Sequence, residues 1–156
     1  MVPQLYKNTA KSKKAMFTRL SQSLFEASIK SAYTRRFKEK GAQAEGVFWS
    51  SRVSQTARFE HVLADMKAEF GSTRFCMADI GCGYGALFNY IRSKPAWRQI
   101  DYCGVDITPE MVNFCKREHP SDRHRFSLGR KPKHPADFAV FVGTFNLCHT
   151  HDYRLW

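Results

Sequence analysis

The segment ADIGCGYGAL, residues 78–87, places Gly81, Gly83 and Gly85 at alternate positions, directly after an apolar run and the acid Asp79. Each glycine costs backbone entropy, so a cluster indicates a turn in which another group comes close to the main chain. Exposed backbone amides between a strand and a helix favour an anionic or strongly polar ligand. We expect Gly81 to allow the turn, Gly83 to admit a ligand, and Gly85 to let strand and helix pack closely.

Asp106 ends the next apolar segment, about 20 residues after Gly85. A carboxylate at the end of a strand beside such a turn can accept hydrogen bonds from both hydroxyls of a ribose. The two features together predict a cofactor that contains a nucleoside. Gly81, Gly83 and Ala86 also satisfy the looser dinucleotide pattern, so an NAD-binding oxidoreductase is an alternative.

The stretches DIGCGYG and YCGVDITPEM together resemble the class I S-adenosylmethionine-dependent methyltransferases. The upstream VFWSSRVSQTARFEHVL and the downstream ADFAVFVGTFNL are similar to a poorly characterised bacterial branch of that superfamily, and the resemblance covers roughly residues 46–148. Asp79 favours this family over a nicotinamide enzyme, because an acid there suits a cationic ligand better than a pyrophosphate. The resemblance implies a Rossmann-like fold, the cofactor S-adenosylmethionine (SAM), and methyl transfer to an acceptor that the sequence does not identify.

The resemblance also implies which residues form the site. The residues expected to bind the cofactor are Asp79, Gly81, Cys82, Gly83, Gly85, Asp106, Ile107, Gly143, Thr144, Arg52 and Trp49. Among them, Asp106 would hold the ribose, Ile107 would pack on the adenine, and Arg52 would pair with the cofactor carboxylate. Phe145 and Asn146 would face the acceptor. No catalytic acid or base stands out, since methyl transfer depends mainly on orientation and proximity.

Simpler interpretations stay open for some of these residues. Arg52 could be an ordinary solvated helix residue, and Trp49 could be a core aromatic. Cys82 is expected to contribute its backbone rather than act as a nucleophile. Asn146 could cap a turn instead of touching a substrate.

The elements that must position these residues alternate along the chain. After a loose start over residues 1–11 we expect helices over 12–39, 54–70, 86–91 and 108–118. We expect strands over 74–80, 100–107, 124–128 and 137–143. This alternation predicts an α/β fold, a Rossmann-like parallel sheet of order 3-2-1-4 preceded by N-terminal helices. The second helix is expected to bury Val53, Ala57, Val62, Leu63 and Met66.

Two features depart from the family pattern. Gly129 and Arg130 follow the third expected strand, where the family often has an acid that contacts the adenine, and the connection to the fourth strand is too short for a full helix. The sequence ends at Trp156, soon after the fourth strand, so we expect an incomplete sheet. The expected domains are a basic helical segment, 1–45, and a partial SAM-binding domain, 46–156.

An incomplete sheet would leave the fourth strand, FAVFV, as an exposed edge. An apolar, uncharged edge invites pairing with another chain, so self-association or a completing partner is expected there. A catalytically inactive remnant that serves as an interaction module is therefore an alternative function.

The formal charge of +11 is concentrated at the start of the chain. The first 40 residues hold ten Lys or Arg against Glu26 and Glu39. Such a segment could bind nucleic acid, so a nucleic-acid methyltransferase is a further alternative, while a solvated basic helix is the simpler interpretation.

The cysteines bear on the compartment and on metal binding. Five cysteines without paired spacing predict reduced thiols and a cytoplasmic protein, although residues 1–40 loosely fit an organelle transit peptide. No apolar run approaches the length of a membrane span, so we expect a soluble chain. The segment CHTH offers ligands at Cys148, His149 and His151, but no second cluster completes a tetrahedral site, so no metal is expected.

Overall fold

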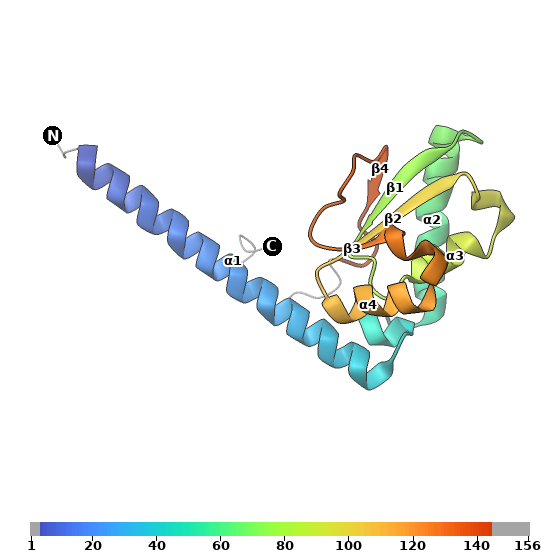
Figure 1. Ribbon diagram of the computed structural model, residues 1–156, viewed down its shortest axis with the longest axis horizontal. Coiled ribbons are helices and arrows are strands. Elements are labelled where there is room, and N and C mark those ends of the chain that lie inside the picture. Colours follow the sequence, from blue (N-terminus) through green and yellow to red (C-terminus); the bar gives the residue numbers. More distant parts are fainter. Residues whose placement is uncertain (1–3, 145–156) are drawn as a thin grey trace. The chain divides into compact units, whose positions relative to one another are not determined.

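The computed structural model describes residues 4–144, with side chains from Leu20 onward (Figure 1). The chain divides into two compact units, one of which includes Met1–Ala32 while the other spans Tyr33–Leu147. The second unit contains the sheet.

A single long helix, α1, spans Gln4–Lys40. It begins earlier than the sequence predicts, because the stretch expected to be loose is rich in Lys, Gln, Leu and Ala, which favour helix. Lys30 and Glu26 form an ion pair at 2.7 Å one turn apart. Leu20 and Leu24 of this helix are 58% and 65% exposed. Within residues 4–144, no helix combines the length and apolar character that a bilayer crossing requires.

The second helix, α2, spans Arg52–Phe70. Ser51 caps its start, since the Ser51 hydroxyl oxygen accepts a hydrogen bond from the Ser54 backbone N–H at 3.1 Å. Four side chains of this helix are buried: Gln55, Phe59, Leu63 and Met66. The prediction was wrong for Val53 and Ala57, which are both exposed. They lie on the side of the helix away from the buried Gln55, Phe59 and Met66.

Four strands form one parallel sheet, as the sequence predicts. They are β1 (Phe75–Ile80), β2 (Ile100–Asp106), β3 (Phe126–Leu128) and β4 (Phe138–Val140), in the order β3-β2-β1-β4. Val105 and Asp106 at the end of β2 lie opposite Ile80 of β1 and Leu128 of β3, respectively. The carboxyl ends of three strands therefore meet at one edge of the sheet.

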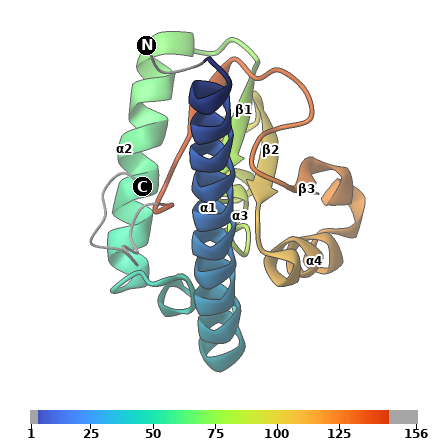
Figure 2. The same cartoon turned by 90° about the vertical axis from the view of Figure 1, so that its left-hand side faces the viewer.

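The helices α3 (Ala86–Arg92) and α4 (Pro109–Glu118) connect β1 to β2 and β2 to β3. No helix connects β3 to β4, which confirms the expected loss of one crossover; Figure 2 shows this connection as an irregular orange segment. The last turns of α1 pack within the same unit, where Phe37 makes an edge-to-face contact with Phe114 of α4.

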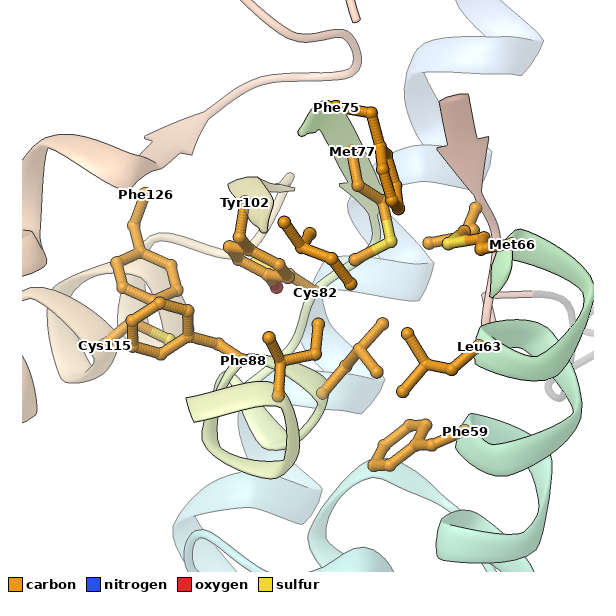
Figure 3. Packing of buried hydrophobic residues seen from close by; sticks show 14 of the residues in the cluster. Phe59, Leu63, Met66, Phe75, Met77, Cys82, Phe88, Tyr102, Cys115 and Phe126 are labelled. Carbon is orange, nitrogen blue, oxygen red and sulfur yellow. The ribbon is translucent and has the colours of Figure 1, made fainter. Parts of the chain in front are cut away.

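The hydrophobic core covers one face of the sheet (Figure 3). Met77 and Tyr102 are register neighbours on this face, and side chains from α2, α3 and α4 pack against it. The largest fully buried members include Leu63, Met66 and Phe126. Three helices thus fix the sheet from one side and leave its carboxyl edge available for the turns described next.

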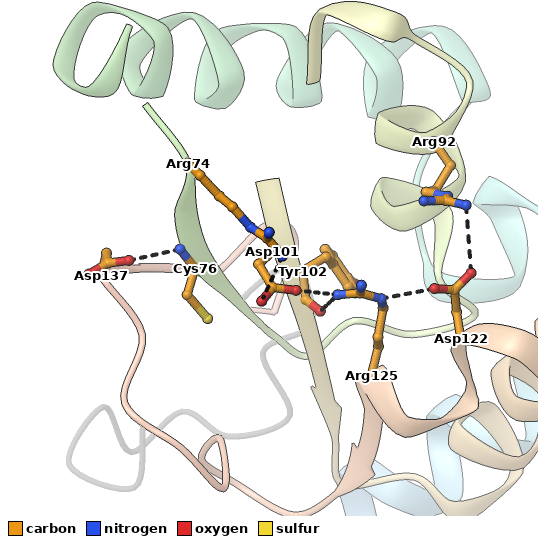
Figure 4. A network of polar contacts seen from close by, with 8 residues as sticks. All are labelled: Arg74, Cys76, Arg92, Asp101, Tyr102, Asp122, Arg125 and Asp137. Carbon is orange, nitrogen blue, oxygen red and sulfur yellow. Dashed lines mark hydrogen bonds and ion pairs between the residues drawn. The ribbon is translucent and has the colours of Figure 1, made fainter. Parts of the chain in front are cut away.

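The amino-terminal end of the sheet is held by a polar network (Figure 4). Arg125, just before β3, bonds to the carboxylate of Asp101 and, at 2.9 Å, to Asp122. Asp137, just before β4, accepts a hydrogen bond from the Cys76 N–H at 2.8 Å. These contacts fix the starts of β3 and β4 at the end of the sheet opposite to the glycine turn.

Candidate functional site

The turn after β1 is made by three glycines in the left-handed region. Their φ angles are +79° at Gly81, +55° at Gly83 and +80° at Gly85, a conformation that other residues adopt only with strain. The N–H groups of Gly81 and Cys82 donate to the Val105 carbonyl at 2.7 and 3.1 Å. The turn is therefore fastened to the end of β2, the neighbouring strand.

Asp106 ends β2 and lies directly beside this turn. One of its carboxylate oxygens accepts a hydrogen bond from the Gly83 N–H, and the other accepts one from the Thr108 N–H, both at 2.8 Å. Burial raises the pKa of Asp106, while these hydrogen bonds act in the opposite direction. The Thr108 side chain and the Ile107 backbone also bond to this carboxylate and favour its ionised form.

Asp79 lies inside the protein beneath the same turn. It is 2% exposed and accepts a hydrogen bond from the Tyr102 hydroxyl at 2.7 Å. Burial raises the pKa of Asp79 to about 7, against the lowering effect of that bond, and the neighbouring Asp106 raises it further. The structure thus places Asp79 under the turn, where it contacts Tyr102.

Two buried thiols flank the turn. Cys115 of α4 donates to the Gly83 carbonyl at 3.4 Å, and its sulfur would lie 3.2 Å from a Cβ added at Gly85. The pKa of the Cys82 thiol is raised well above its usual range by a hydrogen bond with Cys115, by burial and by nearby carboxylates. A protonated, buried thiol is a poor nucleophile, in keeping with a structural role for Cys82.

The turn after β4 lies against the turn after β1. The Thr144 hydroxyl donates to the Ile80 carbonyl at 2.6 Å, and its oxygen would lie 2.6 Å from a Cβ added at Gly81. At Gly143, whose φ is +82°, an added Cβ would lie 2.8 to 3.0 Å from three atoms of the Trp49 indole. The structure therefore brings together Gly81, Gly143, Thr144 and Trp49, which the sequence places far apart.

The segment before α2 runs past the glycine turn. The nearest Val47 side-chain atom would lie 3.5 Å from a Cβ added at Gly83, and Tyr84 donates to Gln55 at 3.0 Å. This Tyr84–Gln55 pair was not predicted from the sequence, although a tyrosine among the glycines indicates a hydroxyl that needs a polar partner. Arg52 is exposed at the start of α2.

The end of β3 also reaches this region. The Gly129 N–H donates to the Asp106 carbonyl at 2.9 Å, Ile107 is half-buried and Arg130 is exposed. Phe145 and Asn146 lie outside the described residues, as do the three candidate metal ligands, Cys148, His149 and His151. Within residues 4–144 no group of three or more His, Cys, Asp or Glu is placed to hold a metal ion.

Comparison with known proteins shows which family this chain resembles. Residues 78–154 match the family described as "Methyltransferase domain". A protein of Mycobacterium tuberculosis named "Putative methyltransferase Rv1506c" is 34% identical over 74 residues, which make up 47% of this chain and 43% of that protein. The chain therefore spans less than half the length of this curated relative. The expected resemblance to methyltransferases is confirmed.

Proposed function

We propose that this chain, which carries a methyltransferase domain over residues 78–154, binds SAM at the carboxyl edge of its sheet and serves methyl transfer to an acceptor. The family match and the relative support the transferase class. The acceptor is not identified by either.

The observation that carries the proposal is the contact between Asp106 and Gly83. Its 2.8 Å hydrogen bond joins the strand-end carboxylate and the glycine turn in one site. Asp106 is buried, accepts hydrogen bonds from backbone N–H groups and from the Thr108 side chain, and has no cationic partner among these donors. The two hydroxyls of a ribose would supply the further donors that such a carboxylate favours. The residues present therefore fit a nucleoside-containing cofactor.

The remaining residues would contact different parts of the cofactor. Ile107 would contact the adenine, and Arg52 and Trp49 would contact the methionine end. The backbone of Gly81 and Gly83 would allow close approach. When bound, SAM supplies an electrophilic methyl group on a sulfonium. The chain contributes orientation and proximity, which place an acceptor atom in line with that group. Phe145 and Asn146 are the proposed acceptor-facing residues.

The test is calorimetric titration with SAM and with its demethylated product, S-adenosylhomocysteine. We expect both to bind, and Asp106→Ala to weaken both about 10- to 100-fold through the loss of charged hydrogen bonds. Asp65→Ala, which removes an exposed carboxylate of α2, is the matched control and should bind normally. Absence of binding to the unaltered chain, or equal binding by Asp106→Ala, would contradict the proposal. Heat with NADH alone would favour the oxidoreductase alternative.

A methyl-transfer assay separates an enzyme from an interaction module, because only the enzyme turns the donor over.

We further propose a cytoplasmic location, supported by four cysteines that are free thiols in the described part of the chain.

A further inference from the structure

We infer that the indole of Trp49 recognises the positively charged sulfonium of the methyl donor and makes the site prefer the donor over its demethylated product. This inference rests on the proposed function, and it adds a basis for discriminating between two ligands that differ by one methyl group and one charge.

The position of Trp49 is fixed by its contact with the turn after β4. Three indole atoms would lie within 3.0 Å of a Cβ at Gly143, so only a glycine leaves room for the ring. The next residue, Thr144, bonds to the Ile80 carbonyl, and its hydroxyl oxygen occupies the space that a Cβ at Gly81 would need. The indole therefore contacts Gly143, the residue directly before Thr144, and Thr144 joins the turns after β1 and β4. It is also partly exposed, so the ring is not fully enclosed by protein.

The strand order gives the direction in which the ligand would extend. With the ribose at Asp106 and the adenine at Ile107, the nucleoside occupies the end of β2. The sulfonium is bonded to the 5′ carbon of the ribose and must lie close to it. Since β1 lies between β2 and β4, a ligand that extends from Asp106 across the glycine turn reaches the turn after β4, where Trp49 lies.

The electrostatics favour an aromatic partner for the cation. Asp79 is buried and bonded to Tyr102, and Asp106 is bonded to Gly83 and Thr108. Asp79 is therefore engaged before a ligand arrives, and in the proposed complex Asp106 faces the ribose hydroxyls rather than the sulfonium. The face of a tryptophan attracts a cation through its ring quadrupole, most strongly where water is partly excluded. A neutral thioether lacks this charge interaction and gains only the weaker contact between sulfur and the ring.

The experiment measures the affinities of SAM and S-adenosylhomocysteine for the full chain and for Trp49→Leu. Leucine keeps apolar bulk but removes the aromatic face. We expect the ratio of the two affinities to shift against SAM by about 3- to 30-fold, with binding of the demethylated product nearly unchanged. Trp49→Phe keeps a weaker aromatic face and should give an intermediate ratio. Tyr90→Leu removes an aromatic side chain of α3 that contacts Phe59 instead, and should leave the ratio unchanged.

The outcomes distinguish failure of the Trp49 inference from failure of the proposed function. A ratio that is the same in Trp49→Leu and the unaltered chain overturns this inference and leaves the proposed function standing. Failure of both ligands to bind the unaltered chain overturns both. Where circular dichroism shows that Trp49→Leu does not fold, the ratio measured for Trp49→Phe decides, and an unchanged ratio there counts against the inference.

Discussion

Asp79 and Asp106 show how two carboxylates on neighbouring strands reach different environments. Asp106 receives two backbone N–H groups, whereas Asp79 receives one tyrosine hydroxyl and is enclosed by the core. The sequence placed both acids beside the glycine turn, but spacing alone does not distinguish a residue under the turn from one at its edge. That difference depends on Tyr102, which faces Asp79 only because β1 and β2 pair in their observed register.

The raised pKa of Asp79 predicts a pH-dependent stability. The folded protein keeps the proton until about pH 7, while an unfolded chain releases it near 3.8, so stability falls as pH rises through this window and levels off above it. The total fall is up to about 4 kcal/mol. Asp79→Asn stays neutral and should become more stable relative to the unaltered chain as pH rises from 4 to 7. Denaturant unfolding at several pH values measures this difference.

Tyr102→Phe is the matched variant for this prediction. It removes the hydroxyl that lowers the pKa of Asp79, so the loss of stability with rising pH should extend to higher pH. Parallel pH profiles for Asp79→Asn and the unaltered chain would contradict the assignment of a proton to Asp79 at neutral pH.

At the scale of elements, the sequence predicted the strands and their order but not every helix face. Alternating apolar segments, and Pro109 at the first position of α4, mark their elements locally. The buried side of α2 depends instead on distant parts of the fold, since Gln55 bonds to Tyr84 and Phe59 and Leu63 join the core, while Val53 faces outward. The contact of Trp49 with Gly143 is equally non-local, so only the three-dimensional structure joins them.

The basic helix α1 gives a prediction about nucleic acid. If its charge binds RNA or DNA, replacing Lys7, Lys11 and Lys14 by Gln should weaken retention and lower the slope of log affinity against log salt by about 2 to 3. Replacing three basic residues of the other unit, Lys67, Lys94 and Arg98, is the control and should change the slope less. Filter binding across a salt series measures both. Retention that is absent at low salt in the unaltered chain would identify α1 as a solvated helix.

At the scale of the whole molecule, the described sheet has an open edge at β4. No strand within residues 4–144 pairs with its outer side, and Phe138 and Phe141 are 36% and 53% exposed. The strand FAV carries no charge or proline that would discourage pairing. We therefore propose that β4 mediates association with a second copy of the chain.

Sizing by light scattering over a concentration series tests this association. Phe141 directly follows β4, and Phe141→Lys should shift the protein toward monomer, because a charge beside an edge strand opposes pairing. Leu128→Lys places the same charge on β3 at the opposite edge, where Leu128 is 56% exposed, and should leave the association unchanged. A monomer at every concentration, or equal effects of both lysines, would contradict the proposal.

The one-sided packing of the sheet also has a consequence for how the sequence can drift over generations. Phe75, Met77 and Tyr102 face the helices, whereas Cys76, Asp101 and Cys103, which alternate with them, are only partly enclosed. Selection should therefore remove substitutions at every second position along the amino-terminal halves of β1 and β2 and tolerate them at Cys76 and Cys103, whereas Asp101 is constrained by its bond to Arg125. Toward the glycine turn this alternation should fade, because Ala78 and Val105 are fully enclosed as well.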